Sequence, residues 1–522
     1  MDSDITRSIL QLGKRAEKYT SEELVETFVD VGHLFTLLES PDHQILYGRR
    51  GTGKTHILNY LTSKIVNNGH CAVNIDLRNI GSTGGIYSDH TIPVPERATR
   101  LLVDTLNVIH DKILDFILVN SEKYNLSTFG PLLDNIADAV SQVQILGPVA
   151  EEIASENTIG KNTSSSFTAS EKGVSFSAGV NRTSTDLNKI RRSISGQEVH
   201  RVHFPSIQIL FKRLIELFES VEIWIVLDEW AEVPLDLQPY LGDLFRRTLF
   251  PLSGITIKIG AIEHRSHFQL MKTTAEYIGI EVGAEVTDLN LDEFMVFDNN
   301  EYSALNFFKN LFFKHVNSAL PSEKKWQFSD EFVNSTFTQQ NVFEEFVRST
   351  EGVPRDAINI LTNAAIKVDV AVTSKISMKN IRDAARVWYN RDKEKSVSYN
   401  PQALQLLRWK IDEVIGNRNA RAFLLSTETK DDLIDYLYDA RVIHLIKESI
   451  SGKDVPGHRY NVYSIDYGAY VELINTTKAP KGLFEAETDE GDSEFINVPS
   501  NDYRAIRRAI LNLNEFYESQ SL

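Results

Sequence analysis

The first 290 or so residues of the 522-residue chain alternate between short apolar runs and stretches with apolar positions at helical spacing. Such runs predict buried strands, and the helical spacing predicts amphipathic helices. Strands alternating with helices favour a parallel sheet with crossover helices. We therefore expect an α/β domain over residues 41–290, preceded by amphipathic helices within residues 1–40. The predicted strands are Gln44–Tyr47, Ala72–Leu77, Val221–Leu227 and Ile255–Ile262, and the predicted helices are Thr55–Asn67, Pro95–Ile117, Ser206–Phe218 and Leu237–Leu249.

The pattern changes after this region. Residues 291–395 have helical spacing throughout, with phenylalanine-rich faces, which predicts a helical lid domain attached to the sheet domain. Residues 400–475 predict two helices, a short strand and a hairpin, the outline of a winged-helix-like α+β domain. Residues 476–522 contain an acidic segment, 487–494, predicted to be a linker, and a last helix at Asn501–Tyr517.

One segment of the sheet domain differs in composition from its surroundings. Residues 156–196 are rich in serine, threonine, glycine and asparagine, which predicts a flexible insertion. Basic residues lie inside it or just after it, and both a solvated loop and a phosphate or nucleic-acid contact stay open for them. These residues are Lys189, Arg191, Arg192 and Arg201.

Charge and cysteine content limit the partners and the compartment. The chain has 55 Lys and Arg against 72 Asp and Glu, a formal charge of −17, so its overall field does not favour nucleic acid or an anionic membrane. A single cysteine excludes an intramolecular disulfide, and no apolar run approaches the roughly 20 residues of a membrane span. The N-terminus lacks the apolar core of a signal peptide. We expect a cytoplasmic protein without membrane association.

A glycine-rich turn follows the first predicted strand. Residues 48–55 read Gly-Arg-Arg-Gly-Thr-Gly-Lys-Thr, which fits the P-loop pattern G-x-x-x-x-G-K-[ST] at every fixed position. The glycines let backbone N–H groups face a phosphate, and the helix N-terminus adds positive potential. Lys54 is expected to reach the β- and γ-phosphates of ATP, and the Thr55 hydroxyl to bind Mg²⁺. The predicted nucleotide-binding residues are Gly48, Arg49, Arg50, Gly51, Thr52, Gly53, Lys54 and Thr55.

An acidic pair follows the most apolar predicted strand, Val221–Leu227. Asp228 and Glu229 come at its carboxyl end, where ligands collect in a parallel sheet. We expect Asp228 to hold the Mg²⁺ shell and Glu229 to polarise the attacking water as a catalytic residue. An acidic cap for the next helix is the alternative. Because the same chain carries a P-loop, we favour catalysis and predict an ATPase.

The motifs and their order resemble the AAA+ class of ATPases, within it the branch of origin-recognition and cell-division-control initiators. The resemblance covers about residues 20–475 and implies a lid whose sensor-2 arginine touches the nucleotide phosphates. Glu351–Asp356, EGVPRD, is similar to that motif, so Arg355 is expected to have this catalytic role. The resemblance also places sensor 1 at Glu263, where this chain departs from the usual Asn, Thr or Ser, and a surface turn is an equal alternative.

Rings of this class supply an arginine to the neighbouring subunit from the segment after sensor 1. The corresponding residues, 276–286, contain no arginine. Arg246, Arg247 and Arg265 could substitute for it, but we slightly favour a solvated helix face for them. The oligomeric state is therefore left open.

The second helix of the winged-helix pattern, within residues 430–443, carries four aspartates and would be repelled by duplex DNA. A protein partner is therefore favoured, with DNA as the other possibility. Two functions stay open. One is an ATP-hydrolysing, initiator-like switch that regulates or loads a partner. The other is an ATP-stabilised scaffold, anchored to protein or DNA, with little turnover.

Overall fold

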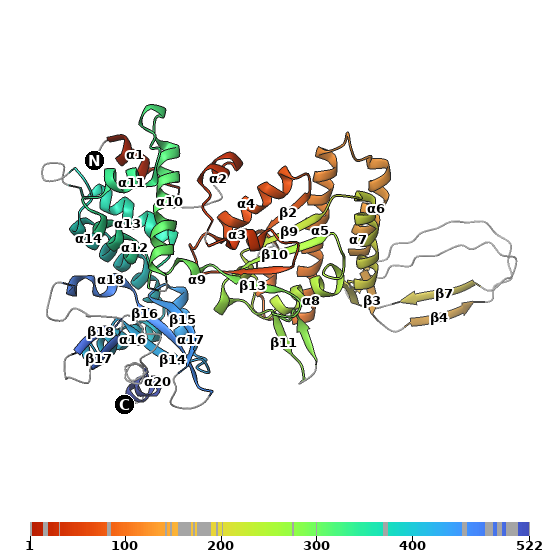
Figure 1. Ribbon diagram of the computed structural model, residues 1–522. Helices are drawn as coiled ribbons and strands as arrows, with labels where there is room; N and C mark the ends of the chain where they lie inside the picture. Colours follow the sequence, from red (N-terminus) through yellow and green to blue (C-terminus); the bar gives the residue numbers. More distant parts are fainter. Residues whose placement is uncertain are drawn as a thin grey trace.

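The computed structural model describes residues 3–13, 19–30, 32–80, 85–140, 202–273, 276–298, 300–368, 374–451, 457–474 and 510–520, together with short strands within 143–200 and 484–496. The chain forms two lobes (Figure 1), one built around the large sheet and the other from the lid helices and the C-terminal domain. Between the lobes lies the short helix α9 (Asp292–Met295).

The sheet has five parallel strands in the order β13-β1-β10-β9-β2. The α/β class and the four strands expected from the sequence are confirmed. The fifth strand, β13, was not predicted because its sequence, TDLN, is not an apolar run. The strands are β1 (Gln44–Tyr47), β2 (Cys71–Asp76), β9 (Ile223–Asp228), β10 (Ile255–Ala261) and β13 (Thr287–Asn290).

Helices cover both faces of this sheet. Successive side chains of a strand point to opposite faces, so Trp224 and Val226 of β9 pack with α4 (Lys54–Asn67), whereas Ile225 and Leu227 pack in the core on the other side. β9 and β10 are buried at every position, which explains their mostly apolar sequences. The lysine of β10, Lys258, donates to the carbonyl oxygens of Ser40 and Asp42. The helices of the other face are α5 (Val94–Val119), α6 (Leu126–Val140), α7 (Phe204–Phe218) and α8 (Gln238–Thr248).

The N-terminal helices do not form a separate body. Helix α1 (Ser3–Leu10) packs against the lid helices α10 (Glu301–Ala319) and α13 (Pro354–Ile366). Helix α2 (Ser21–Thr27) contacts both α10 and α4, so it joins the lid to the sheet domain. The remaining helices of these regions are α3 (Leu34–Leu38), α11 (Ser329–Thr336), α12 (Gln340–Ser349) and α14 (Met378–Trp388).

The C-terminal domain has the predicted order of helices and strands around a three-stranded antiparallel sheet, β14-β16-β15. A π-helical turn, Tyr389–Lys393, and the short α15 (Glu394–Val397) connect it to the lid. The elements that follow are α16 (Pro401–Lys410), β14 (Ala422–Ser426), α17 (Asp432–Asp439), β15 (Ile443–Ser451), β16 (Arg459–Ile465) and α18 (Tyr467–Tyr470).

The last helix, predicted over Asn501–Tyr517, is confirmed at Leu513–Tyr517 and is wrong at 510–512, where the chain is not helical. Ile510 forms a bridge with Leu424, so the chain extends the edge of the β14 strand before α20 (Leu513–Gln520) begins. The two ends of the predicted acidic linker, 487–494, belong to strands that pair with each other, β17 (Phe484–Glu487) and β18 (Ser493–Ile496).

Most of the predicted insertion lies outside the described residues. Its base is a two-stranded ribbon in which β4 (Val149–Ala154) pairs with β7 (Lys189–Ile194). Arg191 and Arg192 are in register with Glu152 and Glu151, so acidic positions face two of the basic candidates across the ribbon, whereas Arg201 is not described. In the described parts of the chain, no helix is both long and apolar enough to cross a bilayer.

Candidate functional site

The P-loop turn connects β1 to α4 with its lysine folded back on the loop. The Lys54 ammonium is buried and donates to the carbonyl oxygens of Gly48 at 2.6 Å and Arg49 at 3.1 Å. Burial lowers the pKa of Lys54. Gly51 and Gly53 have φ values of 91° and 103°, a backbone region open to glycine and rarely to other residues, so the turn depends on them.

The acidic pair lies at the carboxyl end of β9, beside the start of α4. The Thr55 hydroxyl donates to Asp228 Oδ2 at 2.6 Å, although β10 separates β9 from β1 in the sheet. Burial raises the pKa of Asp228. The Thr55 and Asp228 oxygens are the ligand type that Mg²⁺ prefers, so the residues present fit this ion.

Glu229 follows in a left-handed conformation, with φ 59° and ψ 43°, and its backbone N–H donates to Asp228 Oδ1 at 2.8 Å. Burial, and then the neighbouring Asp228 carboxylate, raises the pKa of Glu229. A carboxylate with a raised pKa is a better proton acceptor for an attacking water. Arg78, which follows β2, lies 3.9 Å from the Glu229 carboxylate, and sequence reasoning did not identify it.

A pocket of about 330 Å³ brings the P-loop and Glu229 together with the lid. Its volume is in the range of small-molecule sites. The charged lining comes from Arg50, Lys54, Arg78, Glu229, Glu232 and Arg355, beside the P-loop backbone. Side chains from four other places supply an apolar and aromatic lining that suits a nucleotide base: Phe28, His56, Phe307, His315 and Ile358.

Two histidines of this lining were missed from the sequence. The His56 and His315 rings lie 6.0 Å apart, the first on α4 and the second on the lid helix α10. Burial lowers the pKa of both to about 4, so both imidazoles are neutral at pH 7. Because no motif marks these positions, only the packing of the lid on α4 reveals them.

Arg355 is the second residue of α13 and joins the lid to the P-loop. Its backbone N–H donates to the Gly51 carbonyl oxygen at 3.1 Å, and its side chain lines the same pocket as Lys54. A Cβ atom on Gly51 would lie 2.7 Å from the Arg355 Cβ, so the two segments are in direct contact. The lid arginine predicted from the sequence therefore lies directly against the P-loop.

Arg49 and Arg50 differ from the rest of the predicted nucleotide-binding set. The Arg50 side chain pairs with Glu232 at 2.9 Å at the rim of the pocket. The Arg49 side chain is 1% exposed and pairs with Asp292 at 3.0 Å, and its backbone N–H also donates to Asp292. Both the side chain and the backbone N–H of Arg49 therefore contact Asp292 of α9. The P-loop pattern did not indicate this contact.

The three candidate arginines for a neighbouring site all form ion pairs within the chain. Arg246 pairs with Glu285 at 2.7 Å, and Arg247 pairs with Asp243 at 2.7 Å. Arg265 lies 3.7 Å from Asp439 of α17. The segment 276–286 that lacks an arginine contains β12 (Tyr277–Gly279), which pairs with β11 (Gln269–Met271) in a hairpin.

Two aspartates that make α17 acidic face the sheet domain. The turn Glu263–Arg265 follows β10, and its His264 lies 3.4 Å from Asp435 of α17. Burial raises the pKa of Glu263 to about 7. Asp431 instead caps α17 by accepting from the backbone N–H groups of Leu433 and Ile434. Intramolecular docking and capping thus involve three of the four aspartates that the sequence analysis took as evidence against DNA and in favour of a protein partner.

Comparison with known proteins gives one family match. A family model described as ORC-CDC6-like matches residues 13–344, more than half of the chain. No curated protein sequence matches the chain.

Several solved structures resemble the chain at low identity. The Aeropyrum pernix ORC1 protein in complex with DNA is 11% identical, and the match covers 87% of this chain and 96% of that one with a TM-score of 0.33. The Aeropyrum pernix ORC2 protein with ADPNP and ADP is 10% identical, with coverages of 85% and 89% and a TM-score of 0.32. Drosophila ORC bound to DNA is 10% identical, with coverages of 89% and 94% and a TM-score of 0.29. These similarities are too low to carry an argument about function.

Proposed function

The chain belongs to the ORC-CDC6-like family, and we propose that it is an ATP-binding and ATP-hydrolysing molecular switch that regulates or loads a partner. One observation carries the proposal. A single pocket collects Lys54 from the P-loop, Glu229 from the end of β9 and Arg355 from the lid. These are the groups needed to bind a triphosphate, to orient water and to report the bound state to a second domain.

The mechanism follows from what each side chain can reach. Lys54 would exchange two backbone carbonyls for phosphate oxygens, a stronger charge-assisted contact. Thr55 and Asp228 would hold Mg²⁺, which neutralises phosphate charge when bound. Glu229 would orient the attacking water and accept its proton. Arg78, which pairs with Asp76 at 2.6 Å, adds a positive charge 3.9 Å from the Glu229 carboxylate.

The lid supplies the switching part of the proposal. Arg355 contacts the P-loop through its backbone and lines the pocket with its side chain, so phosphate charge there favours the lid position seen here. Loss of that charge after hydrolysis removes the favourable contact, which lets the lid change position. The single buried cysteine is consistent with a reducing compartment, and we propose a cytoplasmic location.

The first test is a titration with a fluorescent ATP analogue, followed by turnover measurements over a series of protein concentrations. We expect saturable binding and turnover that rises with protein concentration, with duplex DNA or with a protein partner. Binding without turnover under every condition would contradict hydrolysis and favour the ATP-stabilised scaffold.

DNA and protein remain the two proposed partner classes. The acidic α17 helix docks on its own sheet domain, so a DNA contact in this conformation requires another surface. Binding to duplex DNA is measured as a function of salt, because phosphate contacts make log affinity fall steeply with log salt. Absence of binding at low salt would leave protein as the partner.

Arg355→Ala is expected to reduce turnover at saturating ATP by about 10²-fold, since a donor aimed at developing charge contributes on that scale. Affinity for ATP should fall less, because Lys54 and the P-loop backbone still hold the phosphates. Turnover and nucleotide affinity are measured separately for this variant. Arg408→Ala removes an exposed arginine of α16 as the control. Equal turnover in Arg355→Ala and wild type would contradict the assigned role.

A further inference from the structure

The Arg49 side chain occupies a junction of three parts of the molecule. Its guanidinium pairs with Asp292 of α9, donates to the Glu351 carbonyl oxygen of the lid at 3.2 Å, and contacts the His444 Nδ1 atom of β15. It also lies 5.2 Å from the ring centroid of Tyr438 in α17. A residue inside the P-loop is therefore held by the sheet domain, the lid and the C-terminal domain together.

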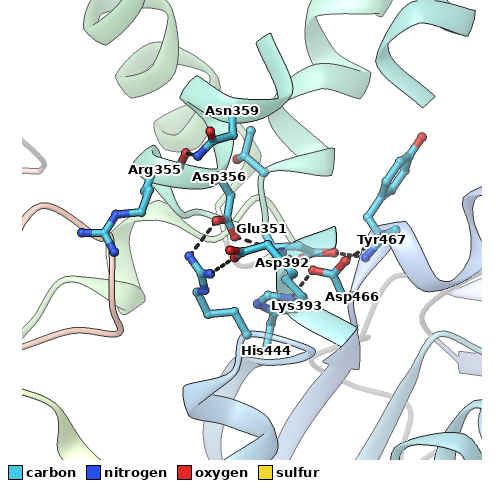
Figure 2. Close-up of polar contacts among 12 residues, drawn as sticks. Glu351, Arg355, Asp356, Asn359, Asp392, Lys393, His444, Asp466 and Tyr467 are labelled. Carbon is cyan, nitrogen blue, oxygen red and sulfur yellow. Dashed lines mark hydrogen bonds and ion pairs between the residues drawn. The ribbon is translucent and has the colours of Figure 1, made fainter. Parts of the chain in front are cut away.

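From His444 a series of buried charged contacts leads back to the lid. His444 Nε2 lies 2.8 Å from Asp466 Oδ2, which also accepts from Lys393 Nζ at 2.5 Å. The Lys393 ammonium lies 3.0 Å from Asp356, the residue after Arg355. Figure 2 shows Asp356 pointing into this cluster, while Arg355 points away from it. The series thus connects the P-loop to the start of α13.

A second cation strengthens the end of this series at the lid. Arg441 donates to Asp356 at 2.7 Å and to Asp392 at 2.6 Å. Arg441 belongs to the C-terminal domain, between α17 and β15, and Asp392 to the π-helical turn that connects this domain to the lid. The docked position of the C-terminal domain is therefore fixed by charges at both ends of the series.

The contacts assign the tautomer of His444. A guanidinium has donors only, so Nδ1 must accept from Arg49, and Nε2 must carry the hydrogen that it donates to Asp466. Burial lowers the pKa of His444 to about 4, in agreement with a neutral ring. A side chain that lacks either the acceptor or the donor leaves a buried charge without one of its partners.

The backbone of Arg49 carries this contact into the nucleotide site. The Arg49 carbonyl oxygen accepts from Lys54 at 3.1 Å and from the Thr52 hydroxyl at 2.9 Å. Two residues further on, the Gly51 carbonyl accepts from the Arg355 backbone N–H at 3.1 Å. Any movement of Arg49 therefore displaces groups that the bound phosphates would contact.

From these contacts we propose that His444 is a positioning residue of the nucleotide site, acting through Arg49, and that ATP occupancy and docking of the C-terminal domain are coupled through this junction. The inference rests on the ATP binding proposed above. The two states are the docked domain, in which Asp435 and Asp439 of α17 face the sheet domain, and an undocked domain that exposes α17.

The test compares His444→Leu with wild type by titration with a fluorescent ATP analogue. Kd is expected to rise about tenfold, within the usual range of coupling between sites. His444→Asn keeps one acceptor and one donor and should recover most of the affinity. Lys447→Leu, an exposed position on the same strand, is the control and should bind as wild type does.

A second readout follows docking itself. Dyes on Ser121→Cys of the sheet domain and Thr429→Cys of the C-terminal domain report their separation, and both positions are exposed while Cys71 is buried. When a non-hydrolysable ATP analogue is added, the energy transfer between the dyes is expected to change in wild type. The same addition should leave it unchanged in His444→Leu. Thermodynamic linkage requires the two effects to be equal: the factor by which bound ATP raises the docking equilibrium constant is the factor by which docking raises the affinity for ATP.

Two further variants separate a positioning role from a general loss of stability. The effects of Arg49→Met and His444→Leu on Kd should be non-additive, because both substitutions remove the same contact, the one between Arg49 and His444. Asp466→Asn keeps the shape of its side chain and serves if His444→Leu does not fold. A folded His444→Leu or Asp466→Asn with wild-type Kd and a wild-type energy-transfer response would overturn the inference and leave the proposed function intact. Absence of ATP binding in wild type would overturn both.

Discussion

Replacing Lys54 by alanine is expected to weaken ATP binding at least about 100-fold, which corresponds to roughly 3 kcal/mol. The buried ammonium is the P-loop side chain that can make charge-assisted contacts with the β- and γ-phosphates. Its present acceptors, the carbonyls of Gly48 and Arg49, show that it already lies inside the loop and needs only a short movement to reach a phosphate.

Binding of a fluorescent ATP analogue measures this effect directly. The thermal shift that saturating ATP produces in wild type should also disappear, because stabilisation by a ligand depends on its concentration relative to Kd. Lys64→Ala is the matched control, since Lys64 lies on the same helix and pairs with Glu39 outside the pocket. A Lys54→Ala protein that binds ATP as wild type does would remove the P-loop from the proposal.

The second large effect is expected for Glu229→Gln, which should bind ATP with nearly wild-type affinity but turn it over about 10²- to 10³-fold more slowly. The substitution keeps the size of the side chain and removes its capacity to accept a proton. Asp228 and Thr55, which would hold the metal ion, are unchanged. ATP should therefore accumulate on the variant rather than ADP.

Single-turnover measurements with radiolabelled ATP test this expectation, because they separate binding from chemistry. Glu232→Gln is the control: Glu232 lines the same pocket but pairs with Arg50 at its rim. If Glu229→Gln hydrolyses ATP at the wild-type rate, the catalytic role moves to another residue. If neither protein hydrolyses ATP at a measurable rate, the scaffold function gains support.

The proposed switch involves three bodies rather than two. The lid meets the P-loop at Arg355 and Gly51, and the C-terminal domain meets it at Arg49 and His444. Asp356, next to Arg355, is held by Lys393 and Arg441. A change of charge in the nucleotide pocket therefore acts on both neighbouring bodies through residues adjacent in sequence.

The position of α17 shows why the composition of one helix does not identify its partner. Its aspartates suggested repulsion of DNA, but Asp435 and Asp439 face His264 and Arg265 of the sheet domain. Surface charge is read from sequence on the assumption that polar residues face solvent. That assumption fails wherever two domains dock through ion pairs.

The sequence by itself determined the parts of the molecule that depend on local backbone chemistry. The P-loop was predictable because its glycines and Lys54 act within one turn. β1, β9 and β10 were predictable because buried parallel strands consist mostly of apolar residues. β13 and the start of α20 were not, since pairing with a neighbouring strand, not an apolar run, holds TDLN and Ile510 in place.

The tertiary structure alone decided which polar groups meet. Arg49 and His444 are 395 positions apart, and no local pattern marks either as a partner of the other. His56 and His315 likewise meet only because α10 packs beside α4. A buried charge needs a partner, but the need can be met by any element that the topology brings near. The sequence therefore determined where the proposed triphosphate site lies, and the packing of the lid and C-terminal domain determined which groups surround it.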